Sequence, residues 1–159
     1  MTISAGDRLP DVLLRVMTDD GPGEVRSTEA LGEGKVVLFA VPGAFTPGCS
    51  NVHLPGFVEN AADLRAKGVD KIACVAVNDV FVLQAWSAAH GADEILMLAD
   101  GNAEFAEAMG TLQDGRGFGM GTRSKRYAAV IEDGVVRSIE VDAPGAIEAS
   151  TCSNLMLRL

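Results

Sequence analysis

Two runs of consecutive apolar residues stand out in the hydrophobic pattern of the chain, 36–41 and 72–77. A strand with one exposed face alternates apolar and polar residues, whereas an unbroken apolar run is typical of a strand covered on both faces. We therefore expect 36–41 to lie in the centre of a sheet, with 71–77 as a second buried strand. Shorter apolar runs predict a first strand at 12–16, closed by a turn at 19–23, and a third buried strand at 95–98.

Segments with helical spacing lie between these strands. Over residues 54–67, the apolar residues Phe57, Ala61 and Leu64 fall on one stripe, charged residues lie largely outside it, and Gly68 ends the helix. Further helices are predicted from Ser27, over 80–90 with Asn78 or Asp79 as the cap, over 103–109, and from about Cys152 to Leu159. The alternation of strands and helices implies βαβ units.

The strongest turn signal is Glu132-Asp133-Gly134, which lies between apolar segments at 127–131 and 135–141 and predicts a β-hairpin. A glycine-rich tract at 115–121 precedes it. This tract predicts a flexible loop, because it fits neither of the common phosphate-binding patterns. The sequence therefore predicts an α/β fold, with a central mixed sheet flanked by helices, in a single domain over residues 1–159.

Composition narrows the functional classes. The 22 acidic and 13 basic side chains give a net charge of −9, which repels nucleic-acid phosphates and anionic membranes. No apolar run approaches the roughly 20 residues that span a bilayer, and residues 1–7 lack the features of a signal peptide. We therefore expect a cytoplasmic protein with no nucleic-acid or membrane partner. Three widely spaced cysteines, Cys49, Cys74 and Cys152, fit a reducing compartment, in which a disulfide is transient and catalytic.

One of these cysteines has a setting that favours reactivity. The strand at 36–41 runs into Pro42–Cys49 (PGAFTPGC), where proline and glycine end the strand and Cys49 opens a helix towards His53. The unpaired N–H groups and the positive dipole end of a helix stabilise an anion. Such a position lowers the pKa of a thiol from about 8.5 towards roughly 4 to 7. Thiol chemistry at Cys49 is therefore the leading hypothesis.

Several segments resemble a known family. The motif Pro42–Ser50, followed by His53–Phe57, closely resembles the active-site segment of the type II peroxiredoxins, which are thiol peroxidases of thioredoxin-like fold. Further matching segments are 75–79, 98–100 and 123–127. The resemblance runs nearly end to end and implies a thioredoxin-like fold. It also implies reduction of hydrogen peroxide and small alkyl hydroperoxides, with electrons from a thiol donor and with no metal or organic cofactor.

The resemblance further implies the site residues. In this family a proline, a threonine, the attacking cysteine and an arginine surround the peroxide. They fall here on Pro42, Thr46, Cys49 and Arg126. Arg126 is preferred to Arg123 because it directly precedes the strand at 127–131. Pro42 is expected to separate the sulfur from water.

The expected chemistry is attack of a Cys49 thiolate on one peroxide oxygen, which expels water or an alcohol and leaves a sulfenic acid. Complete ionisation raises the thiolate fraction at pH 7 only about 30-fold. Most of the acceleration is therefore expected from groups that hold the lengthening O–O bond, namely the Thr46 hydroxyl, the Arg126 guanidinium and backbone N–H groups.

Several routes remain open for clearing the sulfenic acid. Cys152, in Thr151-Cys152-Ser153, is similar to the resolving site of family members that form an internal disulfide. Cys74 lies inside an apolar strand, where a buried thiol is commonplace, and is the weaker candidate. If neither acts, the resemblance implies that glutathione or a glutaredoxin attacks the sulfenic acid directly. Thioredoxin is the other candidate reductant.

The resemblance also implies a homodimer that pairs through loops around the active site. The candidate apolar contacts are Phe45, Phe81, Phe118 and Met120, with the tract 115–121 near the contact. For Phe45 and Phe81, an equally good interpretation is that they belong to the core.

Other interpretations of the reactive segment are weaker. His53 lies one helical turn after Cys49, but two candidate ligands are too few for a metal site. His90 is distant in sequence, so both histidines are expected in structural or polar-network roles. A dithiol oxidoreductase normally carries C-x-x-C, which is missing here. The alternative from another class is a non-enzymatic redox sensor or holdase, which is oxidised once at Cys49 and does not turn over.

Overall fold

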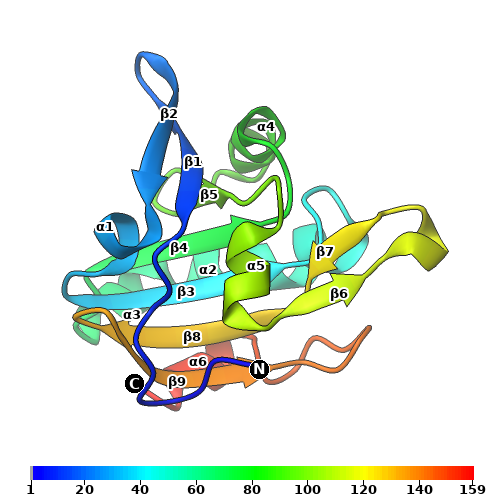
Figure 1. Cartoon of the computed structure of the whole chain (residues 1–159). Coiled ribbons are helices and arrows are strands. Elements are labelled where there is room, and N and C mark those ends of the chain that lie inside the picture. Colours follow the sequence, from blue (N-terminus) through cyan, green and yellow to red (C-terminus); the bar gives the residue numbers. More distant parts are fainter. Residues whose placement is uncertain (1) are drawn as a thin grey trace.

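The computed structural model describes residues 2–159, and Figure 1 shows their arrangement. Seven strands form one sheet in the order β2-β1-β5-β4-β3-β8-β9. They are β1 (Leu13–Thr18), β2 (Gly21–Arg26), β3 (Lys35–Val41), β4 (Lys71–Ala76), β5 (Leu96–Ala99), β8 (Tyr127–Glu132) and β9 (Val135–Val141). A separate ribbon consists of β6 (Leu112–Asp114) and β7 (Thr122–Ser124).

The helices are short, apart from α4. They are α1 (Ser27–Leu31), the π-helix η1 (Cys49–His53), α2 (Leu54–Glu59), α3 (Ala61–Ala66), α4 (Val80–His90), α5 (Glu104–Met109), the 3₁₀ helix η2 (Arg116–Phe118) and α6 (Cys152–Met156). Within residues 2–159, none of the helices has the length and apolar character needed to cross a membrane.

The strand directions make the sheet mixed. β4 is parallel to both β3 and β5, whereas β8 is antiparallel to β3 and continues into the antiparallel hairpin β8–β9. On the other side, β1 meets β5 in the antiparallel direction. The predicted α/β class, with a central mixed sheet flanked by helices, is confirmed.

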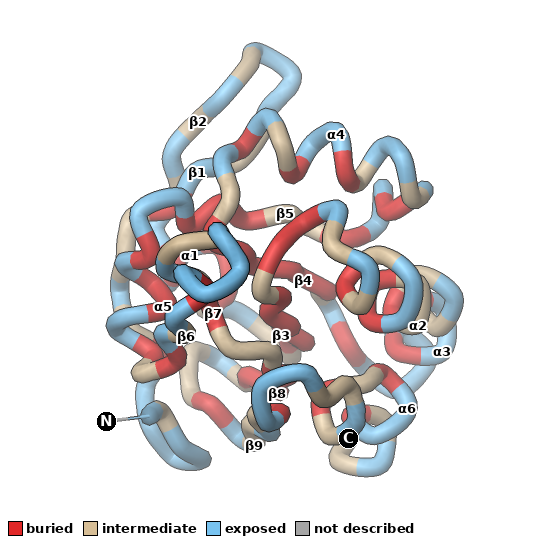
Figure 2. Tube along the Cα trace, turned by 90° about the vertical axis from the view of Figure 1, so that its right-hand side faces the viewer, coloured by how far each residue is buried: buried red, intermediate tan, exposed pale blue. Residues whose placement is uncertain are grey.

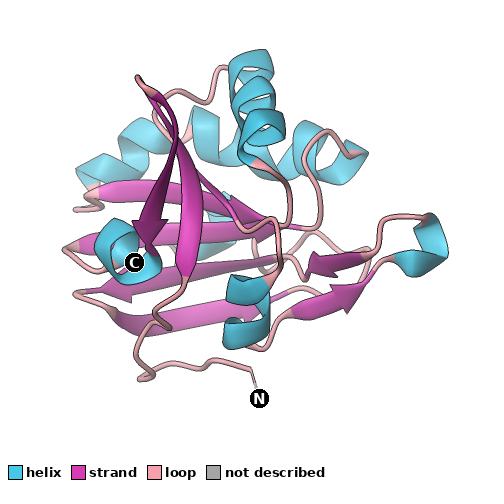
Figure 3. Cartoon of the chain, turned by 45° about the horizontal axis from the view of Figure 1, so that its top comes forward, coloured by secondary structure: helices cyan, strands magenta, loops and turns pink. Residues whose placement is uncertain are grey.

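Both faces of the sheet are covered, as the unbroken apolar runs predict. In β3, odd-numbered residues such as Phe39 face one apolar core, and even-numbered residues such as Leu38 face the other. Helices α2, α3, α4 and α6 pack on the first core, and α1 and α5 on the second (Figure 3). The central strands are therefore almost continuously buried (Figure 2).

The first hairpin differs from the prediction. The segment 19–23 was expected as a turn, but strand β2 already begins at Gly21, so the turn is only Asp19 and Asp20. Pro22 lies opposite Met17 in the ladder. A proline is tolerated there because β2 is the edge strand of the sheet, where its missing N–H faces no further strand. The hairpin β1–β2 extends away from the rest of the sheet (Figure 1).

Two other predicted segments also change. The helix expected over 54–67 is interrupted at Asn60, whose side-chain amide donates to the Gly56 carbonyl at 2.8 Å. The tract 115–121, expected as a flexible loop, forms the tip of the β6–β7 ribbon and contains η2. A backbone hydrogen bond from Gly115 N to Gly121 O closes this tip at 2.7 Å.

Candidate active site

The turn that follows β3 delivers Cys49 to the start of a helix, as the sequence predicts. The Thr46 hydroxyl donates to the Gly43 carbonyl at 2.6 Å, and the Ser50 N–H donates to the Thr46 carbonyl at 2.9 Å. Phe45 adopts a φ of 63°, a conformation that costs a non-glycine residue on the order of 1–3 kcal/mol. The turn therefore holds strain while it fixes where Cys49 begins the helix.

The helix that carries Cys49 opens with one wide turn. In η1 the Leu54 N–H donates to the carbonyl of Cys49, five residues earlier, which is the spacing of a π-helix. This turn places Cys49 and His53 so that both side chains reach the same guanidinium. The next residue after Cys49, Ser50, accepts a hydrogen bond from the indole of Trp86 at 2.9 Å, which ties the helix to α4.

Arg126 contacts both of these side chains. Its Nη2 lies 3.2 Å from the Cys49 sulfur, and its Nη1 lies 2.9 Å from Nδ1 of His53. The sulfur has no exposed surface and borders the apolar core, so this guanidinium is its hydrogen-bonding partner in a dry setting. Gly48 permits the approach, because a Cβ there would lie 3.3 Å from Nη2 of Arg126.

The hydrogen bonds of His53 fix one tautomer of its ring. The carbonyl of Ser150 can only accept a hydrogen bond, so Nε2 of His53, 2.9 Å away, carries the hydrogen. Nδ1 then has a free lone pair, which accepts from Arg126. Burial and the positive charge of Arg126 lower the pKa of His53 to about 4. The ring also packs on Phe39 and Phe57. The predicted polar-network role of His53 matches this geometry.

The other predicted residues, Thr46 and Pro42, lie in the segment that joins β3 to Cys49. Thr46 is half-buried in the turn, and Pro42 is half-buried directly after β3. Arg123 has a different role. Its guanidinium donates to the carbonyls of Met120 at 2.8 Å and Val77 at 2.7 Å. These bonds fasten the β6–β7 ribbon to the end of β4.

Comparisons with known proteins now identify the family. The Redoxin family profile matches residues 4–154. Peroxiredoxin-2E-2 of Oryza sativa subsp. japonica, a chloroplastic protein, is 46% identical, and the match covers 99% of this chain and 73% of the relative. The chain belongs to the type II peroxiredoxins.

Further comparisons agree with this family. Peroxiredoxin-2B of Arabidopsis thaliana is 37% identical over 99% of this chain and 98% of its own. The solved structure of reduced Prx3 from Vibrio vulnificus in complex with hydrogen peroxide superimposes with a TM-score of 0.95 at 48% identity, covering 99% of each chain. The predicted thioredoxin-like fold is therefore confirmed, and the peroxiredoxin is a thiol-dependent peroxidase.

The predicted cytoplasmic location is contradicted. The rice relative and peroxiredoxin-2E of Arabidopsis thaliana, which is 45% identical over 99% of this chain and 70% of the relative, are both named chloroplastic. The prediction failed because receptors read a location from targeting segments, which the packed domain does not need in order to fold. Charge and cysteine spacing in the domain therefore do not fix the compartment.

Neither of the other cysteines of the peroxiredoxin lies in bonding contact with Cys49, since all three thiols are free. Cys74 is fully buried in β4, where burial and the neighbouring Cys49 raise its pKa well above the ordinary value. Cys152 is 2% exposed at the start of α6, and burial, with a smaller effect of Asp63, raises its pKa to about 11.

Cys152 contacts the same helix as Cys49, but further along it. Cys152 packs on Gly56, because a Cβ at Gly56 would lie 3.8 Å from the Cβ of Cys152. Gly56 follows Cys49 by seven residues, which corresponds to roughly 10 Å along a helix. The Cys49 sulfur bonds to Arg126 and Cys152 packs on Gly56, so a disulfide between the two cysteines requires both side chains to leave these contacts.

The aromatic residues predicted at a dimer contact are mostly on the surface. The exposed fractions are 54% for Phe45, 64% for Phe81 and 89% for Phe118, whereas Met120 is half-buried and lies against Gly43. The alternative that Phe45 and Phe81 belong to the core is therefore wrong.

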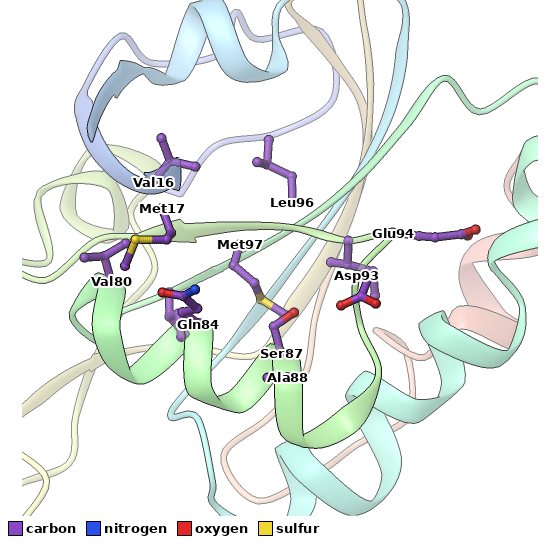
Figure 4. A pocket seen from close by; sticks show the side chains of 12 residues that line it. Val16, Met17, Val80, Gln84, Ser87, Ala88, Asp93, Glu94, Leu96 and Met97 are labelled. Carbon is purple, nitrogen blue, oxygen red and sulfur yellow. The ribbon is translucent and has the colours of Figure 1, made fainter. Parts of the chain in front are cut away.

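A cavity of about 470 Å³ lies elsewhere, where β1 and β5 diverge next to α4 (Figure 4). The two strands pair only at Arg15 and Ala99. Figure 4 shows Met17 and Met97 pointing towards α4 in this opening. None of the predicted site residues lines it. Among residues 2–159 there is also no cluster of three or more His, Cys, Asp or Glu side chains that could hold a metal ion.

Sequence reasoning missed the segment that supports His53. Ser150 lies 97 residues away from His53 along the chain and supplies a backbone carbonyl, which leaves no signature in residue type. Asp142, which organises this segment, directly follows the strand at 135–141. An aspartate after a strand is a common turn signal, so the sequence could indicate a cap there without indicating what the cap supports.

Proposed function

We propose that this peroxiredoxin reduces hydrogen peroxide and small alkyl hydroperoxides, with Cys49 as the attacking residue. The observation that carries the proposal is the contact of 3.2 Å between the Cys49 sulfur and Nη2 of Arg126, at the start of a helix. A cation and helix N–H groups both favour a negative sulfur. The same guanidinium is in place to stabilise charge on the departing oxygen.

In the proposed reaction, the thiolate of Cys49 donates an electron pair to the nearer peroxide oxygen while the O–O bond breaks. The sulfur becomes a sulfenic acid, and the leaving oxygen takes a proton and departs as water or an alcohol. Sulfur is oxidised by two electrons and the peroxide is reduced by two. Arg126 and helix N–H groups stabilise the oxygen on which negative charge develops.

Thr46 takes a role that differs from the expected donor role. Its hydroxyl hydrogen already points to the Gly43 carbonyl, at 2.6 Å. The oxygen therefore offers a lone pair, which can accept the hydrogen of a bound peroxide. We assign Thr46 to orienting the peroxide and Pro42, beside it at the end of β3, to limiting water at the sulfur.

The sulfur has no exposed surface, so entry of the peroxide and reduction of the sulfenic acid both require local opening beside the Cys49 helix. Cys152 is the proposed internal partner, with Cys74 as the weaker candidate. Release of α6 would expose Cys152 and remove the burial that raises its pKa. Glutathione, a glutaredoxin or thioredoxin then completes the cycle, either on a disulfide or on the sulfenic acid itself. Mass spectrometry of peroxide-treated protein distinguishes the two routes by the presence of a Cys49–Cys152 disulfide.

Steady turnover tests the enzymatic role. Hydrogen peroxide is supplied in excess with glutathione, glutaredoxin or thioredoxin in parallel, and peroxide loss is followed. A peroxidase consumes many equivalents with at least one donor and loses this activity in Cys49→Ser. A protein that stops after a single oxidation with every donor is instead a redox sensor or holdase.

A further inference from the structure

The segment 142–151, which joins β9 to α6, is folded around one carboxylate. Oδ1 of Asp142 accepts the N–H of Ala149 at 2.8 Å. Its Oδ2 accepts the N–H groups of Glu148 and Ser150, both at 3.2 Å, together with the Ser150 hydroxyl. Asp142 is only 7% exposed. Four hydrogen bonds to one buried carboxylate therefore fix the shape of this segment, because charge-assisted bonds are the strong ones.

Both ends of the segment are bonded to the active site. At the start, the Asp142 N–H donates to the Arg126 carbonyl at 2.9 Å. Near the end, the Ser150 carbonyl accepts from Nε2 of His53 at 2.9 Å. The Asp142 carboxylate, which closes the segment, therefore sets the position of the Ser150 carbonyl relative to the backbone of Arg126.

We propose that Asp142 is a positioning residue for peroxide reduction, acting through the Ser150 carbonyl and His53 to hold the Arg126 guanidinium on the Cys49 sulfur. The proposal rests on the function given above. Asp142 itself does not contact the sulfur or the peroxide.

The physical link is the choice of tautomer on His53. A fixed carbonyl at Nε2 keeps the hydrogen on that nitrogen and leaves Nδ1 as an acceptor for Arg126. If the carbonyl moves away, the other tautomer becomes available, and it presents an N–H to the N–H of Arg126. Two facing donors repel, so the guanidinium loses the bond that orients it.

The same segment also fastens Cys152. Thr151 caps α6 by accepting the Asn154 N–H, and Cys152 is the first residue of that helix. Arg158 adds a second fastening, since Nη1 donates to the Ala149 carbonyl at 3.3 Å. Loosening the segment therefore has two opposite effects: slower oxidation of Cys49 and easier exposure of Cys152.

The test compares Asp142→Asn with Asp100→Asn in the full chain. Asp100 is a matched control, because its carboxylate accepts the N–H groups of Phe105 and Ala106 at 2.9 Å and, within residues 2–159, forms no hydrogen bond to segment 142–151. One readout is the tautomer of His53 by ¹⁵N NMR, in a chain with two histidines. The other is the rate of Cys49 oxidation, followed by the single tryptophan, Trp86, which bonds to Ser50.

We expect Asp142→Asn to give a mixture of His53 tautomers and to lower the rate of oxidation about tenfold or more, because the Arg126 guanidinium loses part of its positioning. Reaction of Cys152 with an alkylating reagent should become faster. Asp100→Asn should lose thermal stability while keeping the single tautomer and a rate within about twofold of wild type. An unchanged tautomer and rate in folded Asp142→Asn overturns the proposal, as does an equal loss in Asp100→Asn.

Ser150→Ala is the second variant, in case Asp142→Asn does not fold. It deletes only the hydroxyl bond to Asp142 and leaves the carbonyl, so a smaller change in the same direction is expected in both readouts. No change in either readout then contradicts the proposal. Failure of the proposed function looks different: oxidation does not occur at Cys49 in the wild-type protein, whereas the tautomer still responds to Asp142→Asn.

Discussion

At the residue scale, the site depends on two nitrogens of the Arg126 guanidinium, which bond to two different side chains. Arg126 uses one nitrogen on the Cys49 sulfur and a second on His53, so its direction is fixed at two points. Lysine carries the same charge on a single nitrogen and cannot make both bonds in this geometry. Positive charge near the sulfur is therefore only part of what Arg126 contributes.

Arg126→Lys should lower the second-order rate constant for peroxide about 100-fold, a loss typical of removing one positioned donor from a transition state. Stopped-flow measurement with hydrogen peroxide gives this value. Arg116→Lys is the matched control, because Arg116 pairs with Asp114 in an exposed ion pair and should react at the wild-type rate. Equal rates for Arg126→Lys and wild type would remove Arg126 from the mechanism.

The lowered pKa of His53 predicts a dependence of stability on pH. The unfolded chain binds a proton on this histidine near pH 6.5, but the folded protein does so only near pH 4. The free energy of unfolding is therefore unaffected above pH 6.5 and falls as the pH drops from 6.5 towards 4, by on the order of 3 kcal/mol. The charges that face His53 are Arg126, which lowers its pKa, and Asp142, which raises it.

His53→Gln isolates this effect, because an amide can accept from Arg126 and donate to Ser150 without titrating. Denaturant unfolding between pH 4 and 7 should show a shallower loss of stability in the variant than in wild type. Parallel curves for the two proteins would show that His53 is not buried in its neutral form.

The sequence indicated part of the site, through the setting of Cys49 and through the resemblance to the type II peroxiredoxins. Cys49, Thr46 and Arg126 could be selected from the motif and from the position of Arg126 before a strand, and the structure brings Cys49 and Arg126 into contact. The support from Ser150 could not be selected, because it comes from a backbone carbonyl that any residue could supply. The sequence indicated a turn at Asp142, but it did not indicate which groups the Asp142 carboxylate binds.

At the scale of elements, the strands of the sheet were predictable where burial on both faces imposes an apolar run, as at 36–41 and 72–77. β2 was missed because Gly21, Pro22 and Gly23 are read as turn residues, although an edge strand tolerates them. The break at Asn60 was missed because the apolar stripe continues across it. The edge position of β2 decides the first case, and the hydrogen bond from the Asn60 side chain to the Gly56 carbonyl marks the second.

The contact of the Cys49 helix with segment 142–151 predicts the effect of a single methyl group. In Gly48→Ala the new Cβ would lie 2.7 Å from Cδ1 of Ile147 and 3.3 Å from Nη2 of Arg126. Ile147 can move, but the guanidinium is then displaced from the sulfur. Peroxide reduction should slow about tenfold, since misplacement of a positioned group is costly.

Gly117→Ala is the control for this prediction, because no atom lies within 4 Å of a Cβ at Gly117. Its rate constant with hydrogen peroxide should equal that of wild type. If Gly48→Ala also reacts at the wild-type rate, a Cβ at residue 48 does not displace the guanidinium, and the prediction is wrong.

At the scale of the whole molecule, three exposed phenylalanines remain without a partner in the described chain. Phe45, Phe81 and Phe118 are each more than half exposed, and exposed apolar side chains of this size mark association surfaces when they lie together. The homodimer and the single-domain organisation stay predictions. The compartment was not predictable, because the charge and the cysteine spacing of the domain do not determine it.

Phe118→Ser should weaken the proposed homodimer, because it removes the most exposed aromatic side chain, at the tip of the β6–β7 ribbon. Light scattering at micromolar concentration measures the change. Leu157→Ser is the control, since Leu157 is 83% exposed after the end of α6 and should leave the mass unchanged. A wild-type protein that is already monomeric contradicts this prediction.

The most direct test of the central claim is peptide mass spectrometry after reaction with one equivalent of hydrogen peroxide and rapid trapping of sulfenic acid. The account predicts that the trapped modification appears on Cys49, ahead of any change at Cys74 or Cys152, and that Arg126→Lys slows its appearance. Initial oxidation at Cys74 or Cys152, with Cys49 still reduced, would contradict it.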